Sequence, residues 1–299
     1  MKLKKFMGIV SALILIVFSA SGCSSANQAD TEAVNAAIDK FRACSSFSLV
    51  QLSENRETVA FEGEKYAYLA YSEMEMDLIS GEDAQMRTST KAFVSFDSEQ
   101  TEQITASYIV PENGGYAEYL YDGAEWTKFT VEQSDALAGL SADSVAATFF
   151  AENVAFGKAG EETVDGIKAL RYDGRLDGEN LLGMLDANGL LGSNSSMSAN
   201  QQESIRKNLV KDLNDIVISV WIDEASGYPI RVELNMGDMM KGLNDSIAKS
   251  LGNKEAETQL EASVYTISMS LSNFNAVEDL VLPAEAASAR PYEAESSAG

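Results

Sequence analysis

The stretch DIVISVWIDEASGYPIRVELNM, residues 215–236, decides the fold of this chain. Its first part has an apolar residue at every second position: Ile216, Ile218, Val220 and Ile222. Its last part repeats the pattern with Ile230, Val232, Leu234 and Met236. A period of two is typical of a strand that buries one face, and the segment between the two runs is rich in turn-forming residues. The stretch therefore predicts an antiparallel β-hairpin.

The same alternation extends to both sides of this hairpin. Residues 66–78 alternate apolar residues with acidic ones, which predicts a strand with one apolar face and one wet face. Further predicted strands occupy residues 104–131, as a meander of three, residues 167–174 and residues 263–273. Residues 157–166 are expected to be a polar connection. Most of the chain is therefore predicted to be antiparallel sheet.

Helical periodicity interrupts the strands. In residues 31–44 a period of 3.6 places four apolar side chains on one face: Val34, Ala37, Ile38 and Phe41. Further helices are predicted over residues 133–151, 179–191, 200–214 and 236–251. The second and third of these belong to a helical insertion at about residues 177–214, and the polar tail, residues 283–299, is predicted to be loose.

Strands and helices together predict an α+β fold with a mostly antiparallel sheet. One domain over residues 31–282 is large but acceptable, since β-rich domains reach about 250 residues. A division near residues 152–160 into two related halves is the alternative, because similar elements recur around Trp126 and Trp221.

The N-terminal residues carry an export signal. Three lysines precede a short apolar run over residues 6–18, whereas a membrane-spanning helix needs about 20 apolar residues. The small residues before Cys23 resemble a bacterial lipobox, whose cysteine receives a diacylglyceryl group, and two acyl chains hold a protein stably at a bilayer. We therefore predict a lipoprotein signal peptide over residues 1–22, lipidation of Cys23, a flexible tether over residues 23–30, and a location on the extracytoplasmic face of the cell membrane. An ordinary secretion signal with a chance cysteine is the alternative.

Composition excludes several kinds of function. The formal net charge of −24 argues against a nucleic-acid partner, because phosphates need a basic surface. The chain has no histidine, which is the commonest general base and a common metal ligand. If Cys23 is lipidated, Cys44 has no disulfide partner and is predicted to be a buried, inert thiol. Since the sequence also shows no P-loop, dinucleotide or serine-hydrolase motif, we predict no catalytic residue, no metal site and no cofactor.

Two segments resemble the LolA-like superfamily: DGIKALRYDG at residues 165–174 and VWIDEASGYPIRVEL at residues 220–234. The lipobox, the N-terminal helix and the long antiparallel strands are similar too. This superfamily includes lipoprotein carriers and envelope lipoproteins of the LppX and LprG type that bind acylated lipids. The resemblance implies an unclosed, strongly curved β half-barrel whose concave face is covered by helices, with a hydrophobic cavity between them and no catalytic residues. The insertion departs from the compact carriers and leaves the size of the cavity open.

The apolar strand faces supply the candidates for a ligand-binding site between sheet and helices. These are Tyr66, Tyr68, Met74, Met76, Tyr108, Ile230, Val232, Leu234, Tyr265, Ile267 and Met269. They would bind a lipid, an acyl chain or another hydrophobic ligand by burying its apolar surface, and methionine adapts well to irregular apolar shapes. If the same side chains fill a solid core, the chain is instead a structural or protein-interaction module with a partner in the cell envelope. An envelope hydrolase that uses carboxylates alone is a third hypothesis.

Overall fold

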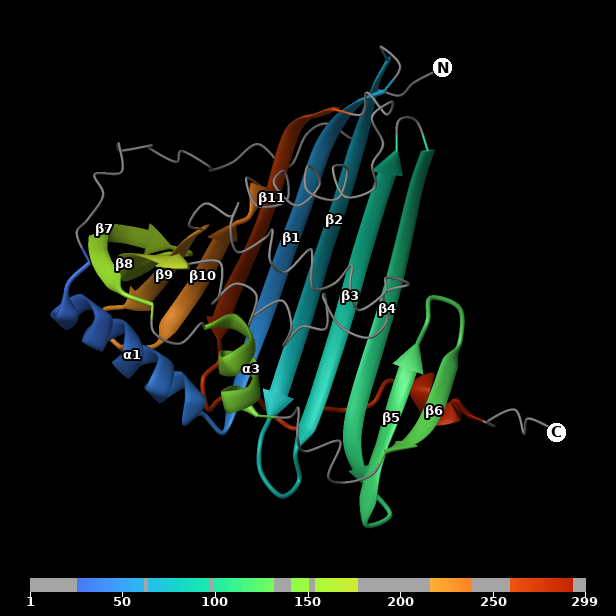
Figure 1. Cartoon of the computed structure of the whole chain (residues 1–299). Helices are drawn as coiled ribbons and strands as arrows, with labels where there is room; N and C mark the ends of the chain where they lie inside the picture. Colours follow the sequence, from blue (N-terminus) through green and yellow to red (C-terminus); the bar gives the residue numbers. More distant parts are fainter. Residues whose placement is uncertain are drawn as a thin grey trace, which may run out of the picture.

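The computed structural model of the chain describes residues 26–61, 64–96, 99–131, 141–150, 154–176, 216–237 and 259–292. In these parts, strands form one 12-stranded sheet in the order β12-β6-β5-β4-β3-β2-β1-β11-β10-β9-β8-β7 (Figure 1). Neighbouring strands are antiparallel, except that β12 runs parallel to β6. Strands from both sides of residues 152–160 join the same sheet.

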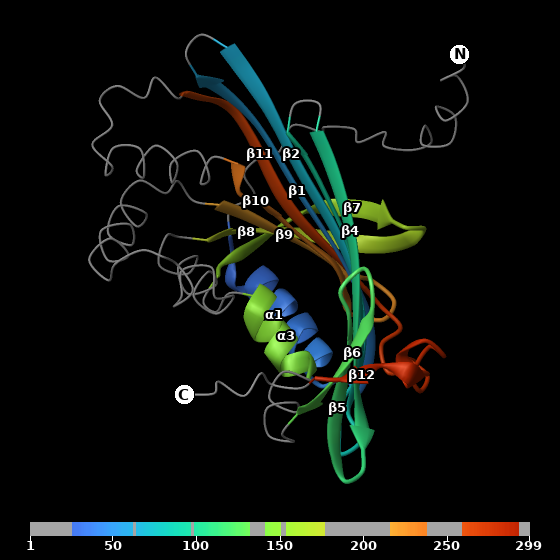
Figure 2. The ribbon, with the colours of Figure 1, turned by 90° about the vertical axis from the view of Figure 1, so that its right-hand side faces the viewer.

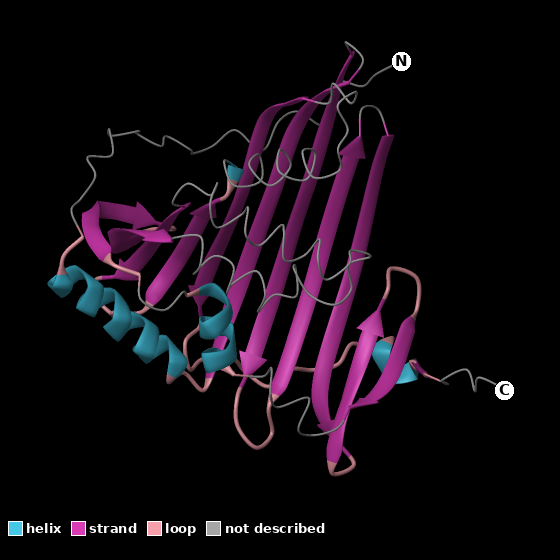
Figure 3. Cartoon of the chain, viewed as in Figure 1, coloured by secondary structure: helices cyan, strands magenta, loops and turns pink. Residues whose placement is uncertain are grey.

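The strands before residue 140 are β1 (Ser46–Phe61), β2 (Glu64–Ile79), β3 (Gln85–Phe96), β4 (Glu99–Glu112), β5 (Gly115–Tyr121) and β6 (Trp126–Val131). The later strands are β7 (Phe156–Val164), β8 (Ile167–Leu176), β9 (Ile216–Asp223), β10 (Pro229–Asn235), β11 (Gln259–Ser272) and β12 (Arg290–Pro291). The helices are α1 (Gln28–Arg42), α3 (Ala142–Phe149) and the short 3-10 helix η1 (Ala286–Ser288). Figure 3 shows how strongly strand predominates over helix in the described residues.

The sheet is strongly curved and does not close on itself. Figure 2 shows the long central strands bending around the side on which α1 and α3 lie. The edge strands β12 and β7 stand at opposite ends of the strand order and do not pair. The predicted curved, unclosed antiparallel sheet is therefore confirmed. The cover of the whole concave face by helices stays a prediction, because residues 177–214 and 238–251 lie outside the described residues.

Helix α1 is held at both its start and its apolar face. Asn27 caps it by accepting a hydrogen bond from the Asp30 backbone N–H at 2.9 Å, the type of cap that stabilises the first turn. Asp30 Oδ2 also accepts the Lys158 N–H of β7 at 2.8 Å, which ties the helix to the edge of the sheet. The four predicted core residues of this helix are its buried ones: Val34, Ala37, Ile38 and Phe41. The helix starts at Gln28, three residues before the predicted position, because Asn27 is its cap.

The hairpin predicted over residues 215–236 is present as β9 and β10. Asp223 shapes its turn by accepting the backbone N–H groups of Ala225 at 3.0 Å and Ser226 at 3.1 Å. The register shifts between Pro229 and Arg231. Because of this shift, Ile230 packs with Trp221, Val164 and Ala169, whereas Val232 belongs to the main core. The prediction that Ile230 shares a face with Val232 and Leu234 was therefore wrong.

Residues 157–166 are more regular than predicted. The expected polar connection at residues 157–166 is mostly the edge strand β7, which pairs with β8 through a two-residue turn at Asp165 and Gly166. Both turn residues have positive φ, 50° and 83°, as a type I′ hairpin turn requires. The polar side chains of β7 face solvent, and β7 lies at the edge of the sheet. Polarity along a sequence thus did not distinguish an exposed strand from a loop.

The described part of the polar tail, up to residue 292, packs on the sheet. We call residues 282–292 the C-terminal strap, which contains η1 and β12. Ala286 of this strap is fully buried and clusters with Ala117 and Tyr119 on the side of the sheet away from α1. The Tyr292 N–H donates to the Lys128 carbonyl oxygen at 2.8 Å, which continues the pairing of β12 with β6. The expectation of a loose tail from residue 283 was therefore wrong for the strap, whose small residues let it lie flat on the sheet.

Candidate functional site

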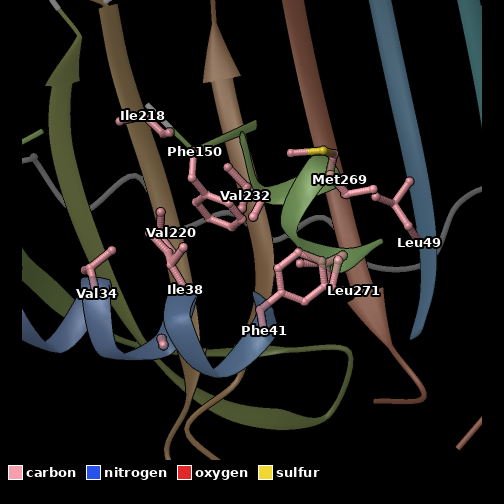
Figure 4. Packing of buried hydrophobic residues seen from close by; sticks show 14 of the residues in the cluster. Val34, Ile38, Phe41, Leu49, Phe150, Ile218, Val220, Val232, Met269 and Leu271 are labelled. Atoms are coloured by element: carbon pink, nitrogen blue, oxygen red, sulfur yellow. The ribbon is translucent and has the colours of Figure 1, made fainter. Parts of the chain in front are cut away.

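The candidate site is the inner face of the sheet, defined as the side that faces α1 and α3. At one end of this face, the two helices close an apolar core against β9, β10 and β11 (Figure 4). Phe41 of α1 and Phe150, just after α3, point toward Val232 and Leu271 of the sheet (Figure 4). All four side chains are buried. This end of the inner face is packed as a hydrophobic core.

Seven of the predicted site residues lie in or against this core. Val232, Leu234 and Met269 are buried members of it, with exposed fractions of 0%, 2% and 1%. Met74, Met76, Tyr265 and Ile267 pack against it but are only partly buried. The structure therefore brings these seven residues together. Three of them are buried, and the other four are partly exposed.

Tyr66 and Tyr68 lie farther along β2, toward the start of that strand. The Tyr66 ring stacks on Phe96 of β3, with ring centroids 6.0 Å apart and an interplanar angle of 6°. Phe96 is 52% exposed. These aromatic residues therefore extend the inner face beyond the core, without belonging to it.

Tyr108 is not part of the site. It packs with Trp126 against the C-terminal strap, on the opposite face of the sheet from α1. On β4 it is Ile109, the next residue, that packs against the main core. The alternation of β4 correctly indicated a strand, but both of its faces carry apolar residues, so the pattern did not show which face lies inward. Ile230, as described above, is also outside the site.

Sequence reasoning missed a polar band on the inner face. Pairing with Met269, Ile267 and Tyr265 of β11 places three β1 residues on this face: Gln51, Ser53 and Asn55. Pairing across β2 and β3 continues the band with Ser72, Thr88 and Thr90. All six are partly buried. The signal that could have found them is the continuation of the Phe47 and Leu49 alternation along β1 into polar residues.

Tyr265 is a partly buried ionisable residue on this face. Burial raises the pKa of its hydroxyl, because the charged phenolate loses its hydration. The Tyr265 hydroxyl has no hydrogen-bond partner within the described part of the chain. Asn55, which is opposite it in the pairing of β1 with β11, donates from Nδ2 to Glu57 Oε1 at 3.3 Å. Its amide oxygen is buried without a partner.

Other chemically interesting groups have structural roles. Cys44 is buried and burial raises the pKa of its thiol, which confirms the predicted buried thiol and favours the unreactive protonated form. On the outer face, the guanidinium groups of Arg171 and Arg231 lie 5.2 Å and 5.4 Å from the Trp221 ring. Each arginine also pairs with a carboxylate on its own strand. Among the described residues, no group of three or more side chains could hold a metal ion.

The described residues also form a hollow of about 300 Å³, whose lining includes Tyr116 of the main core. It is bounded by the loop between β2 and β3 and by the hairpin of β4 and β5, and its lining includes Glu82, Asp83 and Glu112. Such a polar, acidic hollow does not suit a hydrophobic ligand. No helix in the described residues is both long and apolar enough to cross a membrane.

Comparison with known proteins gives matches of structure only. No protein-family model and no curated protein matches the chain. LprF from Mycobacterium bovis matches with a TM-score of 0.44 and 12% identity, over 86% of this chain and 98% of that chain. The lipoprotein LppX of Mycobacterium tuberculosis matches with a TM-score of 0.37 and 12% identity, over 84% of this chain and 97% of that chain.

A domain from Vibrio parahaemolyticus, described as an outer membrane lipoprotein-sorting protein, matches with a TM-score of 0.22 and 10% identity, over 84% of this chain and 94% of that chain. Because the TM-scores are below 0.5, we infer the function from this chain's own residues.

Proposed function

We propose that this chain is a membrane-anchored, extracytoplasmic lipoprotein that binds a lipid, an acyl chain or another hydrophobic ligand on the inner face of its sheet. The binding is non-catalytic and needs no cofactor. The sheet supplies a curved, partly apolar wall, and binding removes the apolar surface of the ligand from water.

One observation carries this proposal: the apolar inner face continues beyond the part that α1 and α3 seal. Met74, Met76 and Ile267 stay partly exposed although they touch the core. Large apolar side chains that border a packed core usually become buried, and an apolar patch left open is typical of a binding surface. Methionine side chains also adjust to ligands of different shape.

The proposed anchor is a diacylglyceryl group on Cys23, which lies outside the described residues. Helix α1 starts at Gln28, so few residues separate this cysteine from the folded domain. The tether therefore holds the domain close to the membrane surface, where a lipid ligand would be exchanged.

Native mass spectrometry after mild detergent extraction tests ligand binding. We expect a mass in excess of the protein by that of one lipid, and we expect Met74→Asp combined with Ile267→Asp to abolish it. The matched control is Glu75→Ala, on the opposite face of β2 from Met74. Two results together would contradict the proposal. The wild-type protein would carry no ligand, and fatty acyl compounds would not change its melting temperature.

The Cys23→Ser variant tests the anchor. We expect the variant to be released from the membrane fraction or to accumulate as an unprocessed precursor, because the acyl chains supply the membrane affinity. Unchanged membrane retention of a processed variant would show that the anchor lies elsewhere.

The second candidate is a structural or protein-interaction module of the cell envelope. The full burial of Val232, Leu234 and Met269 favours it, because these three predicted ligand contacts are parts of a solid core. This candidate predicts that the wild-type protein carries no lipid and that Met74→Asp with Ile267→Asp affects stability alone.

A further inference from the structure

The inner face combines an apolar end with a polar band, and Asn55 of this band is opposite Tyr265, which packs against the core. We infer that the bound molecule is an amphiphile with an uncharged, hydroxyl-bearing head group, and that a hydroxyl of this group donates a hydrogen bond to Asn55 Oδ1. This inference rests on the proposed function and specifies the chemistry of its ligand.

The first observation is an unpaired buried acceptor. Asn55 Nδ2 donates to the Glu57 carboxylate at 3.3 Å, and a carboxylate can only accept, so the amide orientation is determined. The amide oxygen Oδ1 therefore faces away from Glu57, where it is buried without a hydrogen-bond partner. Buried acceptors are rarely left unpaired, because their lost hydration is not compensated. A partner that binds from outside the chain would supply the missing donor.

The second observation is the surroundings of this oxygen. Asn55 is opposite Tyr265 on β11 and the small residue Ala70 on β2. The Tyr265 hydroxyl has no hydrogen-bond partner among the described residues, and it can accept or donate. Ser53 and Ser72 follow next on the same face and oppose each other. Asn55, Tyr265 and the two serines are uncharged, and the Glu57 carboxylate beside Asn55 would repel a phosphate, so these groups suit hydroxyl groups better than a phosphate.

The third observation is the arrangement of apolar and polar residues along the inner face. Met74 and Ile267 pack against the sealed core and pair with Gln51 and Ser53 of the polar band. An acyl chain placed along these residues would bring its head group to the band. The net charge of −24 disfavours a free fatty acid, whose carboxylate is repelled and cannot donate a hydrogen bond at neutral pH.

The experiment compares two probes on the delipidated full-length protein. One is a monoacylglycerol, and the other is the same molecule with both hydroxyls methylated, which keeps the acyl chain and removes the hydrogen-bond donors. Each probe displaces a fluorescent acyl reporter. We expect the monoacylglycerol to bind about tenfold more tightly, since one well-placed hydrogen bond to a buried group is worth about this factor.

The Asn55→Leu variant removes the acceptor while keeping a similar volume. We expect it to bind both probes equally, at the affinity of the methylated one, and to melt at the same or a higher temperature because an unpaired polar group is gone. Tyr265→Phe, a milder change, should reduce the preference about threefold. The control Thr266→Val, on the opposite face of β11, should keep the full preference.

The outcomes separate the two proposals. If wild type binds both probes equally, or if Asn55→Leu keeps the preference, the hydroxyl inference is wrong although the proposed function stands. If neither probe binds to wild type, both are wrong.

Discussion

Phe41 is the residue on which the closed end of the molecule depends most. It is fully buried, and its ring centroid lies 4.9 Å from that of Phe47 in an edge-to-face arrangement. Its ring also lies 6.3 Å from Phe150 and 6.4 Å from Phe274. One side chain therefore joins α1 to the sheet, to α3 and to the segment after β11. Aromatic contacts of this kind add to the gain from burial alone.

The Phe41→Ala variant should lower the free energy of unfolding by about 3–5 kcal/mol, because it removes buried surface and leaves a cavity. Urea unfolding followed by circular dichroism would measure this change. The exposed Asn35 of the same helix provides the control, since Asn35→Ala should change stability by less than about 0.5 kcal/mol. Equal effects of the two changes would show that α1 is not packed as described.

Glu112 provides a pH-dependent contribution to stability. It accepts a hydrogen bond from Lys128 Nζ at 2.6 Å and one from the Tyr119 hydroxyl at 2.9 Å. The bond from Lys128, followed by that from Tyr119, lowers the pKa of the Glu112 carboxyl below its ordinary value of 4.5. Because the pKa is lower in the folded state, the contribution is complete above pH 4.5 and is lost as the pH falls through the folded-state value.

The Glu112→Gln variant should therefore be less stable than wild type near neutral pH, and the difference should shrink in acid. The partners are partly exposed, so water screens the pair and the difference should not exceed about 1 kcal/mol. Urea unfolding at about pH 7 and about pH 3 measures it. A difference that stays constant across this range would show that ionisation of Glu112 is not responsible.

At the scale of elements, the turn of the edge hairpin of β7 and β8 depends on backbone conformation. Its turn has positive φ at both Asp165 and Gly166. A side chain at position 166 would meet no atom within 4 Å, so any cost of one comes from the backbone alone. Farther along β8, Gly174 is different: a Cβ there would lie 2.5 Å from Val154 Cγ1.

Gly166→Ala should destabilise the protein by about 1 kcal/mol, because alanine disfavours positive φ. Gly160 is a matched control in the same hairpin, since a Cβ there also meets no atom within 4 Å and its φ is not positive. Gly160→Ala should change stability by less than about 0.5 kcal/mol. Thermal unfolding of both variants measures these changes in stability. A larger loss of stability at position 160 than at position 166 would contradict the turn assignment.

At the scale of the whole molecule, the described strands form an unclosed sheet. The two edges of this sheet are protected differently. The edge strand β7 is polar and irregular, with a register shift between Lys158 and Gly160. The other edge, β6, is covered by the C-terminal strap through β12. Irregular, charged or covered edges prevent strands of separate molecules from pairing. The strap also covers the outer apolar cluster around Tyr119.

Truncation after residue 281 should therefore cause self-association, because it exposes both the β6 edge and the outer cluster. Analytical ultracentrifugation should show oligomers that wild type does not form, together with increased binding of a hydrophobic dye. Truncation after residue 292 keeps the strap and is the control, which should behave as wild type does. A monomeric protein after the longer truncation would show that the strap is dispensable for this protection.

The local patterns of the sequence predicted much of this fold. Period-two alternation identified β2, the meander of β4 to β6, and the hairpin of β9 and β10, while a period of 3.6 identified α1 and its four core residues. These patterns are reliable because each element must turn its apolar side chains toward a single buried face. The lipobox and the acidic composition likewise depend on sequence alone, and from them come the predicted anchor and the exclusion of nucleic acid.

Only the tertiary structure decided which apolar residues belong to the site. Tyr108 and Val232 look alike in the sequence, yet one lies under the C-terminal strap and the other in the core beside α1. A one-residue register shift moved Ile230 to the opposite cluster, and an edge position allowed β7 to be polar. Asn55 is identified as a candidate ligand contact only through its neighbours on adjacent strands, Tyr265 and Ala70, which are distant in sequence. Alternation specifies that a strand has two different faces, but the long-range packing of the whole chain determines which face is inside.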